Sequence, residues 1–274
     1  MKAPYEVACL GPAGTYSEDA AIGYFGAAAK RLLVPSLDEV FAAVEATQSV
    51  YGVVAVENST EGSVARTLDL LAATELKVCG ELTLGIHHAL MSSAKELVDI
   101  HCVRAHAQAL AQCLGWLSQN VPHARREAVS SNAEGARMAS LDPASAAIAS
   151  ERSALQYGVP VLFADIQDIE TNQTRFLILG GEDQGWSDDA RTLMIISVAN
   201  EPGALYKALE PFHRHAISMS RLESRPSRRG VWEYNFYIEL VGHRTDPSIA
   251  AALSELEKIA TVRMLGSFAA RAVS

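Results

Sequence analysis

The sequence predicts an α/β protein made of two consecutive units. Its 274 residues exceed the roughly 100 to 200 residues of one typical domain. Over residues 5–179, short runs rich in β-branched residues alternate with helical patterns, which indicates helices layered on a largely parallel sheet. Residues 180–189 break this alternation with glycines and acidic residues, as linkers do. We therefore expect one domain over residues 4–181 and a second over residues 192–270.

The first unit reads as alternating strands and helices. A Ser-Leu-Asp-Glu capping box at residues 36–39 marks one helix start, and Gly158 and Pro160 end an alanine-rich stretch over residues 144–157 that we expect to be helical. In chain order the expected elements are strand 7–10, a helix from residue 18, the capping-box helix, strand 51–56, a helix with Val64, Leu68 and Leu71 on one face, strand 102–104, a helix bearing Leu110, Cys113, Leu114 and Leu117, helix 144–157 and strand 177–179.

The second unit has the order strand, helix, strand, strand, helix, strand, which is a ferredoxin-like βαββαβ pattern. Its fourth element has the clearest periodicity, because every second residue is apolar and the residues between include Glu233, Asn235 and Glu239. Such a sheet commonly extends or stacks across a twofold axis, so we expect a homodimer or homotetramer. The expected elements are 192–199, 203–215, 217–223, 231–240, 249–259 and 262–268, and the apolar face of the fourth holds Trp232, Tyr234, Phe236, Ile238 and Leu240.

Composition excludes several classes of partner. The formal net charge of −9 argues against nucleic acid, whose phosphates require a basic surface. No apolar run reaches the roughly 20 residues that cross a membrane, and residues 1–6 lack a hydrophobic signal core, so we expect a cytoplasmic protein. The four cysteines form no Cys-x-x-Cys pair and are expected to be buried free thiols. Neither a metal-binding pattern nor a glycine-rich nucleotide fingerprint is present, so we expect no metal and no cofactor.

Three polar turns adjoin predicted strands and carry the groups suited to binding. Residues 57–62 read ENSTEG between a strand and a helix, residues 11–17 read GPAGTYS after the first strand, and residues 172–176 read NQTRF before the last strand of the first unit. Backbone N–H groups at a helix start favour an anion. An ordinary connecting loop explains each turn equally well when that turn is considered alone.

Together and in this order, the three turns resemble the prephenate dehydratase family, whose Gly-Pro-x-Gly-Thr-aromatic-Ser and Thr-Arg-Phe signatures they match. The resemblance implies a two-lobed domain like those of periplasmic binding proteins. It also implies conversion of prephenate to phenylpyruvate, water and CO2 in phenylalanine biosynthesis. We expect no chorismate mutase region before it. Aromatisation of the ring supplies the driving force, so this reaction requires neither a metal nor an organic cofactor.

The resemblance also implies roles for individual residues. The hydroxyl of Thr174 donates a hydrogen bond to the leaving oxygen, and Glu57 is a candidate proton source if burial keeps its carboxyl protonated. Glu57 fits equally well as a charge at a helix start or as an anchor of its turn. An acidic protein that binds a dianion needs a locally positive site, which helix N-termini and arginine can provide. The expected substrate donors are Thr15, Ser17, Asn58, Ser59 and Arg175.

Two histidine segments extend this resemblance. His88 matches the family's Ile-x-His-x-Leu pattern, although a histidine on an apolar strand is more often part of a hydrogen-bonded core than a catalyst. Residues 105–113 resemble Ser-His-Pro-Gln-Ala-Leu-x-Gln-Cys, with Ala105 and Ala107 in place of the serine and the proline. This segment makes Gln112 a candidate substrate contact and includes His106 and Gln108.

The second unit resembles an ACT domain, a small module that binds amino acids. The resemblance rests on Glu-Pro-Gly-Ala-Leu at residues 201–205 and Glu-Ser-Arg-Pro at residues 223–226, both of which match phenylalanine-binding motifs. Ser218 stands where the family usually has asparagine, so we expect weaker binding of L-phenylalanine. In a purely structural interpretation, Gly203 only starts a helix and Arg225 is a solvated charge. The expected effector contacts are Gly203, Ala204 and Leu205, supported by Glu223, Ser224, Arg225 and Pro226.

Two other functions remain compatible with the sequence. Arogenate dehydratase performs the same elimination on a substrate with an amino group in place of the keto group. A noncatalytic amino-acid sensor would combine the same two units, although the Thr-Arg-Phe segment at residues 174–176 argues against it.

Overall fold

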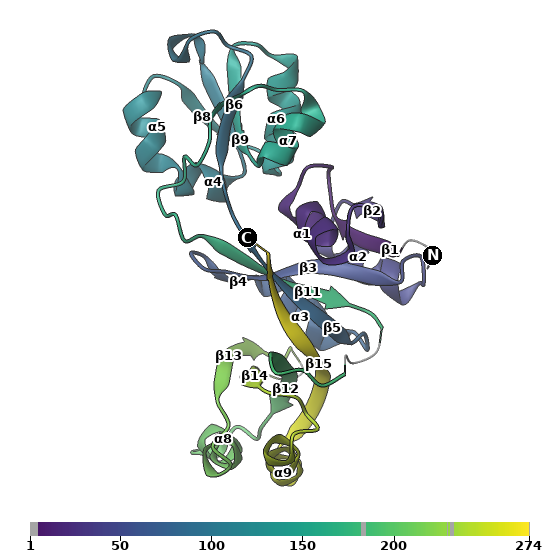
Figure 1. Cartoon of the computed structure of the whole chain (residues 1–274). Coiled ribbons are helices and arrows are strands. Elements are labelled where there is room, and N and C mark those ends of the chain that lie inside the picture. Colours follow the sequence, from purple (N-terminus) through teal and green to yellow (C-terminus); the bar gives the residue numbers. More distant parts are fainter. Residues whose placement is uncertain (1–4, 182–184, 229, 231–232, 274) are drawn as a thin grey trace.

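The computed structural model describes residues 5–181, 185–228, 230 and 233–273, and it consists of two lobes and a C-terminal domain (Figure 1). Val231, Trp232 and residues 182–184 of the expected linker lie outside the described residues. The two-lobed α/β arrangement and the βαββαβ order of the second unit are both confirmed. None of the described helices has the length and apolar character needed to cross a membrane.

Lobe 1 is a mixed sheet whose strands run in the order β5-β11-β3-β1-β2, with the short β4 paired to β3. Strands β1, β2 and β3 are parallel, whereas β11 is antiparallel to both β3 and β5, so the expected parallel sheet is only partly correct. The elements are β1 (Glu6–Leu10), α1 (Tyr16–Phe25), β2 (Lys30–Val34), α2 (Leu37–Glu45), β3 (Tyr51–Asn58), β4 (Gly62–Ser63), α3 (Ala65–Ala73), β5 (Val78–Gly85) and β11 (Gln173–Leu179).

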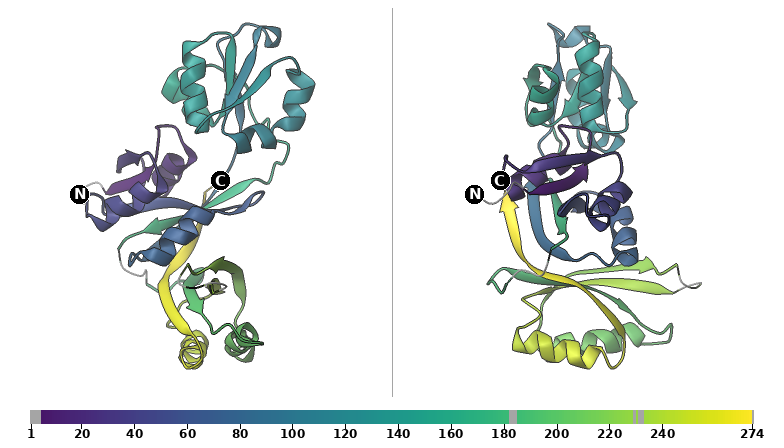
Figure 2. Two further views of the ribbon diagram at one scale, coloured as in Figure 1. Left: turned by 180° about the vertical axis from the view of Figure 1, so that it is seen from behind. Right: turned by 90° about the vertical axis from the view of Figure 1, so that its right-hand side faces the viewer.

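Lobe 2 is a five-stranded sheet in the order β10-β6-β9-β7-β8 with helices on both faces (Figure 2). The chain enters it between β5 and β6 and leaves it between β10 and β11, so two crossings join the lobes. The elements are β6 (Ala89–Ser92), a 3₁₀ turn (Leu97–Asp99), β7 (Cys102–Ala105), α4 (Ala107–Gln112), α5 (Leu114–Asn120), β8 (Arg125–Ala128), α6 (Asn132–Leu141), β9 (Ser145–Ala149), α7 (Glu151–Tyr157) and β10 (Val161–Phe163).

The expected helix over residues 144–157 is wrong in its first half. Ser145–Ala149 form β9, the central strand of lobe 2, and only Glu151–Tyr157 are helical. All five residues of β9 are buried between an antiparallel and a parallel neighbour. Small side chains let α6 pack closely on this strand, so tertiary packing overrides the helix propensity of alanine.

The C-terminal domain is an antiparallel sheet in the order β13-β14-β12-β15 with α8 and α9 on one face. Its other face packs on lobe 1, so Asn235 and Glu239 are buried instead of facing solvent. Helices α8 and α9 cover the apolar face of β14, which includes Ile238 and Leu240. The elements are β12 (Ala190–Ser197), α8 (Ala204–Arg214), β13 (Met219–Pro226), β14 (Tyr234–Val241), α9 (Pro247–Leu256) and β15 (Thr261–Val273).

The C-terminal domain and lobe 1 share one sheet and one hydrophobic core. Strand β15 continues beyond the expected residue 268 and pairs in parallel with β5, which makes the two sheets a single ten-stranded sheet. Leu68 and Leu71 of α3 pack in the same cluster as Tyr237 and Phe268 of the C-terminal domain. The Tyr237 hydroxyl donates a 2.5 Å hydrogen bond to the Leu68 carbonyl. The two units are therefore joined by backbone pairing and by packing.

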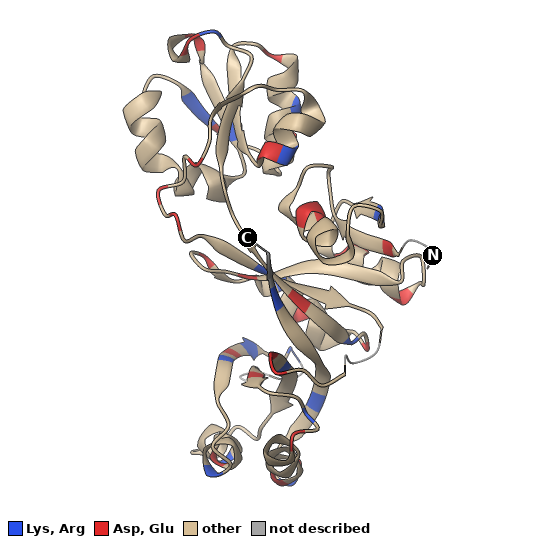
Figure 3. Cartoon of the chain, in the orientation of Figure 1, with Lys and Arg blue, Asp and Glu red and all other residues tan. Residues whose placement is uncertain are grey.

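Basic and acidic residues occur in all three parts of the chain (Figure 3). The four cysteines are buried free thiols, as expected, and burial raises the pKa of Cys9 and of Cys113 to about 12.

Candidate active site

A cavity of about 250 Å³ lies where the two lobes face each other. Lobe 1 contributes residues from the β1–α1 turn, β3 and β11, and lobe 2 contributes residues from α4, α6 and α7. Among the described residues, its lining contains no Lys, Arg, Asp or Glu. It is lined by Leu10, Gly14, Thr15, Tyr16, Ser17, Ala55, Asn58, Ile86, His88, His106, Gln108, Ala109, Gln112, Ser130, Ser131, Asn132, Ala133, Ser150, Thr174 and Phe176.

Four helices begin at this cavity. Their N-cap residues are Thr15 for α1, His106 for α4, Ser131 for α6 and Ser150 for α7, and all four line the cavity. Each helix N-terminus carries a partial positive charge from its aligned peptide dipoles and unpaired N–H groups. The cavity is therefore suited to an anion even though no cationic side chain of the described chain lines it.

Thr174 and Asn58 face the cavity side by side because β11 and β3 pair them directly. The Asn58 Nδ2 group donates to Thr174 Oγ1 at 3.0 Å, and it is also 2.8 Å from Asn172 Oδ1 and 3.1 Å from the Gln173 carbonyl. Thr174 Oγ1 thus accepts a hydrogen bond from the protein, which leaves its own proton free to be donated into the cavity.

A chain of hydrogen bonds leads from lobe 2 to Thr174. Gln112 at the end of α4 donates through Nε2 to Thr60 Oγ1 at 2.9 Å, and Thr60 donates to Asn58 Oδ1 at 2.6 Å. Gln112 Oε1 accepts from Asn172 Nδ2 at 3.2 Å. The bonds from Gln112 through Thr60 and Asn58 run in one donor-to-acceptor direction to Thr174, and aligned hydrogen bonds polarise one another. Asn58 also donates to Asn172, which closes a ring of bonds back to Gln112. This chain also holds the lobes together across the cavity.

His88 is the buried start of this chain. Its Nε2 lies 2.9 Å from Gln112 Oε1, which can only accept, so Nε2 carries a proton. Nδ1 lies 3.2 Å from the Tyr16 hydroxyl, and that hydroxyl donates to the His87 carbonyl at 2.5 Å. Burial lowers the pKa of His88, although the bond to Gln112 acts in the opposite direction. A neutral, hydrogen-bonded imidazole positions Gln112.

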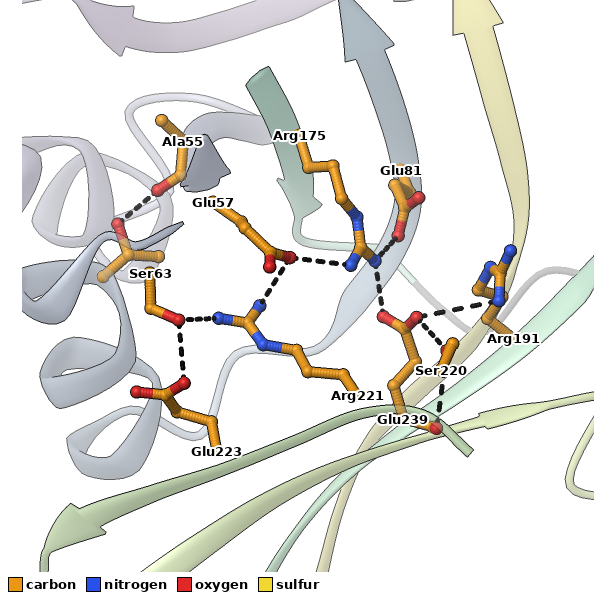
Figure 4. Close-up of polar contacts among 11 residues, drawn as sticks. Ala55, Glu57, Ser63, Glu81, Arg175, Arg191, Ser220, Arg221, Glu223 and Glu239 are labelled. Carbon is orange, nitrogen blue, oxygen red and sulfur yellow. Dashed lines mark hydrogen bonds and ion pairs between the residues drawn. The ribbon is translucent and has the colours of Figure 1, made fainter. Parts of the chain in front are cut away.

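Glu57 and Arg175 do not reach the cavity. Glu57 directly precedes Asn58, and Arg175 directly follows Thr174. Because successive side chains alternate between the faces of a strand, both project from the opposite face of the lobe 1 sheet. There Arg175 Nη1 lies 3.0 Å from Glu57, and Arg175 Nη2 lies 2.5 Å from Glu81 and 2.6 Å from Glu239 of the C-terminal domain (Figure 4). The structure thus separates these two expected site residues from Thr174.

The charges in this cluster strongly influence one another. Burial lowers the pKa of the Arg175 guanidinium, but its bond to Glu81 and the charge of Glu239 outweigh this effect, so the net pKa is raised. Burial also raises the pKa of Glu81, although the bond to Arg175 opposes the shift. Arg175 is therefore a permanent cation paired with three acidic side chains from two domains.

Of the remaining expected substrate contacts, some line the cavity and one does not. Thr15 and Ser17 line the cavity, and Thr15 Oγ1 donates to the Leu10 carbonyl at 2.7 Å while capping α1. Ser59 lies outside the cavity lining, where its Oγ accepts from the Gln173 backbone N–H at 2.9 Å and so anchors the turn. Gln112 lines the cavity as expected.

Several residues of the cavity, or of the hydrogen-bond chain beside it, were missed by sequence reasoning. Thr60 and Asn172 sit inside the ENSTEG and NQTRF turns, so their motifs contained the signal. Ser131 could have been found from its capping box with Glu134, because the Glu134 backbone N–H donates to Ser131 Oγ at 3.0 Å. Nothing in the sequence shows that this helix start faces the first one, because only the fold of lobe 2 brings them together.

The expected effector residues belong to two different faces of the C-terminal domain. Gly203 caps α8 with a left-handed backbone (φ 80°), and Ala204 and Leu205 form the first turn of that helix. Glu223 and Arg225 project from β13 toward lobe 1, where they bond Ser63 at 3.0 Å and Asp69 at 2.9 Å. Ser224 and Pro226 alternate with them and are exposed. Of the second motif, Glu223 and Arg225 are therefore engaged with lobe 1.

The burial of His88 predicts a pH-dependent stability. Its pKa in the folded protein lies below the ordinary 6.5. As the pH falls below about 6.5, the unfolded chain takes up a proton that the folded protein resists, so the free energy of unfolding decreases. Urea unfolding at pH 7.5 and 5.5 should show a smaller decrease for His88→Gln than for the wild type. An identical decrease in both proteins would contradict this prediction.

Comparison with known proteins agrees with this architecture. The family model for prephenate dehydratase matches residues 7–184, and the ACT domain model matches residues 192–258. A bifunctional chorismate mutase/prephenate dehydratase of Neisseria gonorrhoeae is 45% identical over 98% of this chain and 75% of that protein. A prephenate dehydratase of Mycobacterium ulcerans is 34% identical over 96% of this chain and 88% of that protein.

A solved structure shows the same arrangement of lobes and C-terminal domain. It is described as prephenate dehydratase from Arthrobacter aurescens in complex with L-Phe, and it is 33% identical to this chain. The two superpose with a TM-score of 0.89 over 96% of this chain and 89% of that one. With a family model that spans most of the chain and relatives of this similarity, the chain belongs to the prephenate dehydratase family and carries a C-terminal ACT domain.

Proposed function

We propose that this chain converts prephenate to phenylpyruvate, water and CO2 in the cavity between its lobes. The observation that carries the proposal is the directed chain of hydrogen bonds that ends at Thr174, with the Thr174 proton free to point into the cavity. Four helix N-termini around the same cavity suit the carboxylates of the substrate.

The reaction is a coupled elimination. The electron pair of the bond to the ring carboxylate moves into the ring as CO2 leaves, and the ring hydroxyl departs from the opposite carbon with its bonding electrons. That oxygen gains a proton to leave as water, so one proton is consumed per dianion of prephenate. Thr174 donates its hydrogen bond to the departing oxygen, where negative charge develops in the transition state.

The source of the consumed proton differs from the sequence-based expectation. Glu57 is paired with Arg175 on the far face of lobe 1, and no carboxyl group lines the cavity among the described residues. In this proposal water delivers the proton through the Thr174 hydroxyl. Glu57 serves the junction with the C-terminal domain instead.

The lining of the cavity favours prephenate over arogenate. Arogenate carries an ammonium group where prephenate has a keto group. Neutral side chains and the positive ends of four helices surround the cavity, and these oppose a cation while they attract carboxylates. The noncatalytic alternative leaves the polarised hydroxyl of Thr174 without a role.

Replacing Thr174 by alanine should lower kcat by about a hundredfold or more, because one preorganised donor to a developing oxyanion contributes this much. KM should change little, since the bond strengthens mainly in the transition state. Thr174→Ser should retain most of the turnover because it keeps the hydroxyl. Formation of phenylpyruvate is followed by its absorbance, with the exposed Thr171→Ala as the control. Turnover near the wild-type value in Thr174→Ala would remove Thr174 from the mechanism.

We further propose that L-phenylalanine binds the C-terminal domain and lowers turnover. Support comes from the ACT domain match and from the related structure described with L-Phe. The expected homodimer or homotetramer stays a prediction. Strand β13 is a free edge of the ten-stranded sheet, with Met219 37% and Leu222 44% exposed, and a second chain bound there would protect it.

Gly203→Val should weaken phenylalanine binding at least tenfold, because the left-handed backbone at the start of α8 strains a β-branched residue. Titration calorimetry measures the affinity. Gly26→Val is the matched control, since Gly26 in lobe 1 also has a left-handed φ (85°) and open space where a side chain would be added. Equal loss of binding in both variants, or equal binding in wild type and Gly203→Val, would place the effector elsewhere.

A further inference from the structure

The hairpin formed by β3 and β4 contacts both the cavity and the C-terminal domain. Its strands pair Glu57 with Ser63 and Asn58 with Gly62. Asn58 and Thr60 on this hairpin belong to the hydrogen-bond chain that ends at Thr174. Ser63 lies five residues after Asn58 and is half-buried on the side of the C-terminal domain. One short element therefore carries both sets of contacts.

Strand β13 holds the hairpin through the Ser63 hydroxyl. Ser63 Oγ donates to Glu223 Oε2 at 3.0 Å and accepts from Arg221 Nη2 at 2.7 Å (Figure 4). Arg221 also lies 3.8 Å from Glu57 at the other edge of the hairpin. Both partners of Ser63 are ionised side chains, and hydrogen bonds to charged groups are stronger than neutral ones.

Arg221, one of the two residues that bond Ser63, has an unsatisfied hydrogen-bond donor. The Arg221 side chain is only 7% exposed, and its Nε has no hydrogen-bond partner among the described residues. Arg225, four residues along the same strand, also has a buried and unpaired Nε in this part of the chain. A buried donor without an acceptor costs about 1 to 3 kcal/mol, so a shift of β13 that gave these groups an acceptor would be stabilised by a comparable amount.

A second contact ties the same strand pair to the C-terminal domain. Glu239 of β14 bonds Arg175, which is adjacent to Thr174 in β11. The pairing of β11 with β3 shifts register between Arg175 and Phe176. Such a bulge locally disrupts the ladder and redirects side chains. The β3–β4 hairpin and β11 therefore both contact the C-terminal domain through side-chain bonds.

We propose that Ser63 couples the C-terminal domain to the active site. A shift of β13 moves Ser63, the β3–β4 hairpin transmits this movement to Asn58 and Thr60, and the hydrogen bonds to Thr174 and Gln112 change with them. Ser63 is a positioning residue because it touches neither the cavity nor the reacting groups. The inference rests on the proposed phenylalanine regulation and names the contact that transmits it.

The test compares three variants with the wild type. Ser63→Ala removes both hydrogen bonds, and Ser63→Thr keeps the hydroxyl. Ser118→Ala is the matched control, because Ser118 also accepts a hydrogen bond from an arginine, Arg126 at 2.8 Å, but lies on lobe 2 far along the chain from the hairpin. For each protein, calorimetry gives the phenylalanine affinity, and the absorbance assay gives turnover with and without saturating phenylalanine.

Ser63→Ala should bind phenylalanine within about twofold of the wild-type affinity and keep its turnover without effector, because it leaves both binding sites intact. The factor by which saturating phenylalanine lowers turnover should decrease at least threefold. Allosteric couplings are typically about 5- to 150-fold, so this decrease would remove a large part of a typical coupling. Ser63→Thr and Ser118→Ala should be inhibited like the wild type. Unchanged inhibition of Ser63→Ala, or equal loss in Ser63→Thr or in Ser118→Ala, would overturn the proposal.

A measurement without catalysis separates this inference from the proposed function. Phenylalanine should change the hydrogen exchange of the backbone amides of residues 58–63 in the wild type but not in Ser63→Ala. If the wild type turned over no prephenate and this difference were still seen, the proposed reaction would fail while the coupling stood. If phenylalanine changed the exchange equally in both proteins, or in neither, the coupling through Ser63 would be wrong whatever the activity.

Discussion

The antiparallel pairing of β3 with β11 is the constraint on which the rest of the structure depends. It places Asn58 opposite Thr174 on the cavity face and Glu57 opposite Arg175 on the reverse face. One pair of strands therefore places Thr174 and Asn58 at the cavity on one side and forms the ion-pair junction with the C-terminal domain on the other. Successive side chains of a strand alternate between the two faces of the sheet. A change in the register of β3 and β11 would therefore displace both the cavity pair and the ion pair.

The site reconciles an acidic protein with an anionic substrate through backbone dipoles. The formal charge is −9, and the lining of the cavity has no cationic side chain among the described residues. Helix starts from both lobes supply the positive potential instead, so the site is complete only when the lobes face each other. The bond between Gln112 and Thr60 crosses this gap, which links closure of the lobes to the polarisation of Thr174.

The junction between the units is more extensive than a linker implies. Strand β15 leaves the C-terminal sheet and pairs with β5, while Tyr237 enters the core beneath α3. Glu81 and Glu239 share the guanidinium of Arg175 across this junction. The C-terminal domain is thus positioned to influence β11 and the β3–β4 hairpin directly, without a long path through the lobes. Residues that sequence reasoning assigned to the cavity, Glu57 and Arg175, have their partners here.

Local pattern by itself determined much of this protein. The sequence predicted the alternation of β14, the capping box at residues 36–39 and the turns bounded by glycine and proline. These features depend only on residues that are neighbours in the sequence. The motifs also identified Thr174, Asn58 and Gln112 as cavity residues. Only the tertiary structure decided the strand at Ser145–Ala149, the direction of β11, the face on which Arg175 lies and the meeting of four helix starts. These features depend on which distant segments pair and pack, and a linear pattern carries no information about the partner.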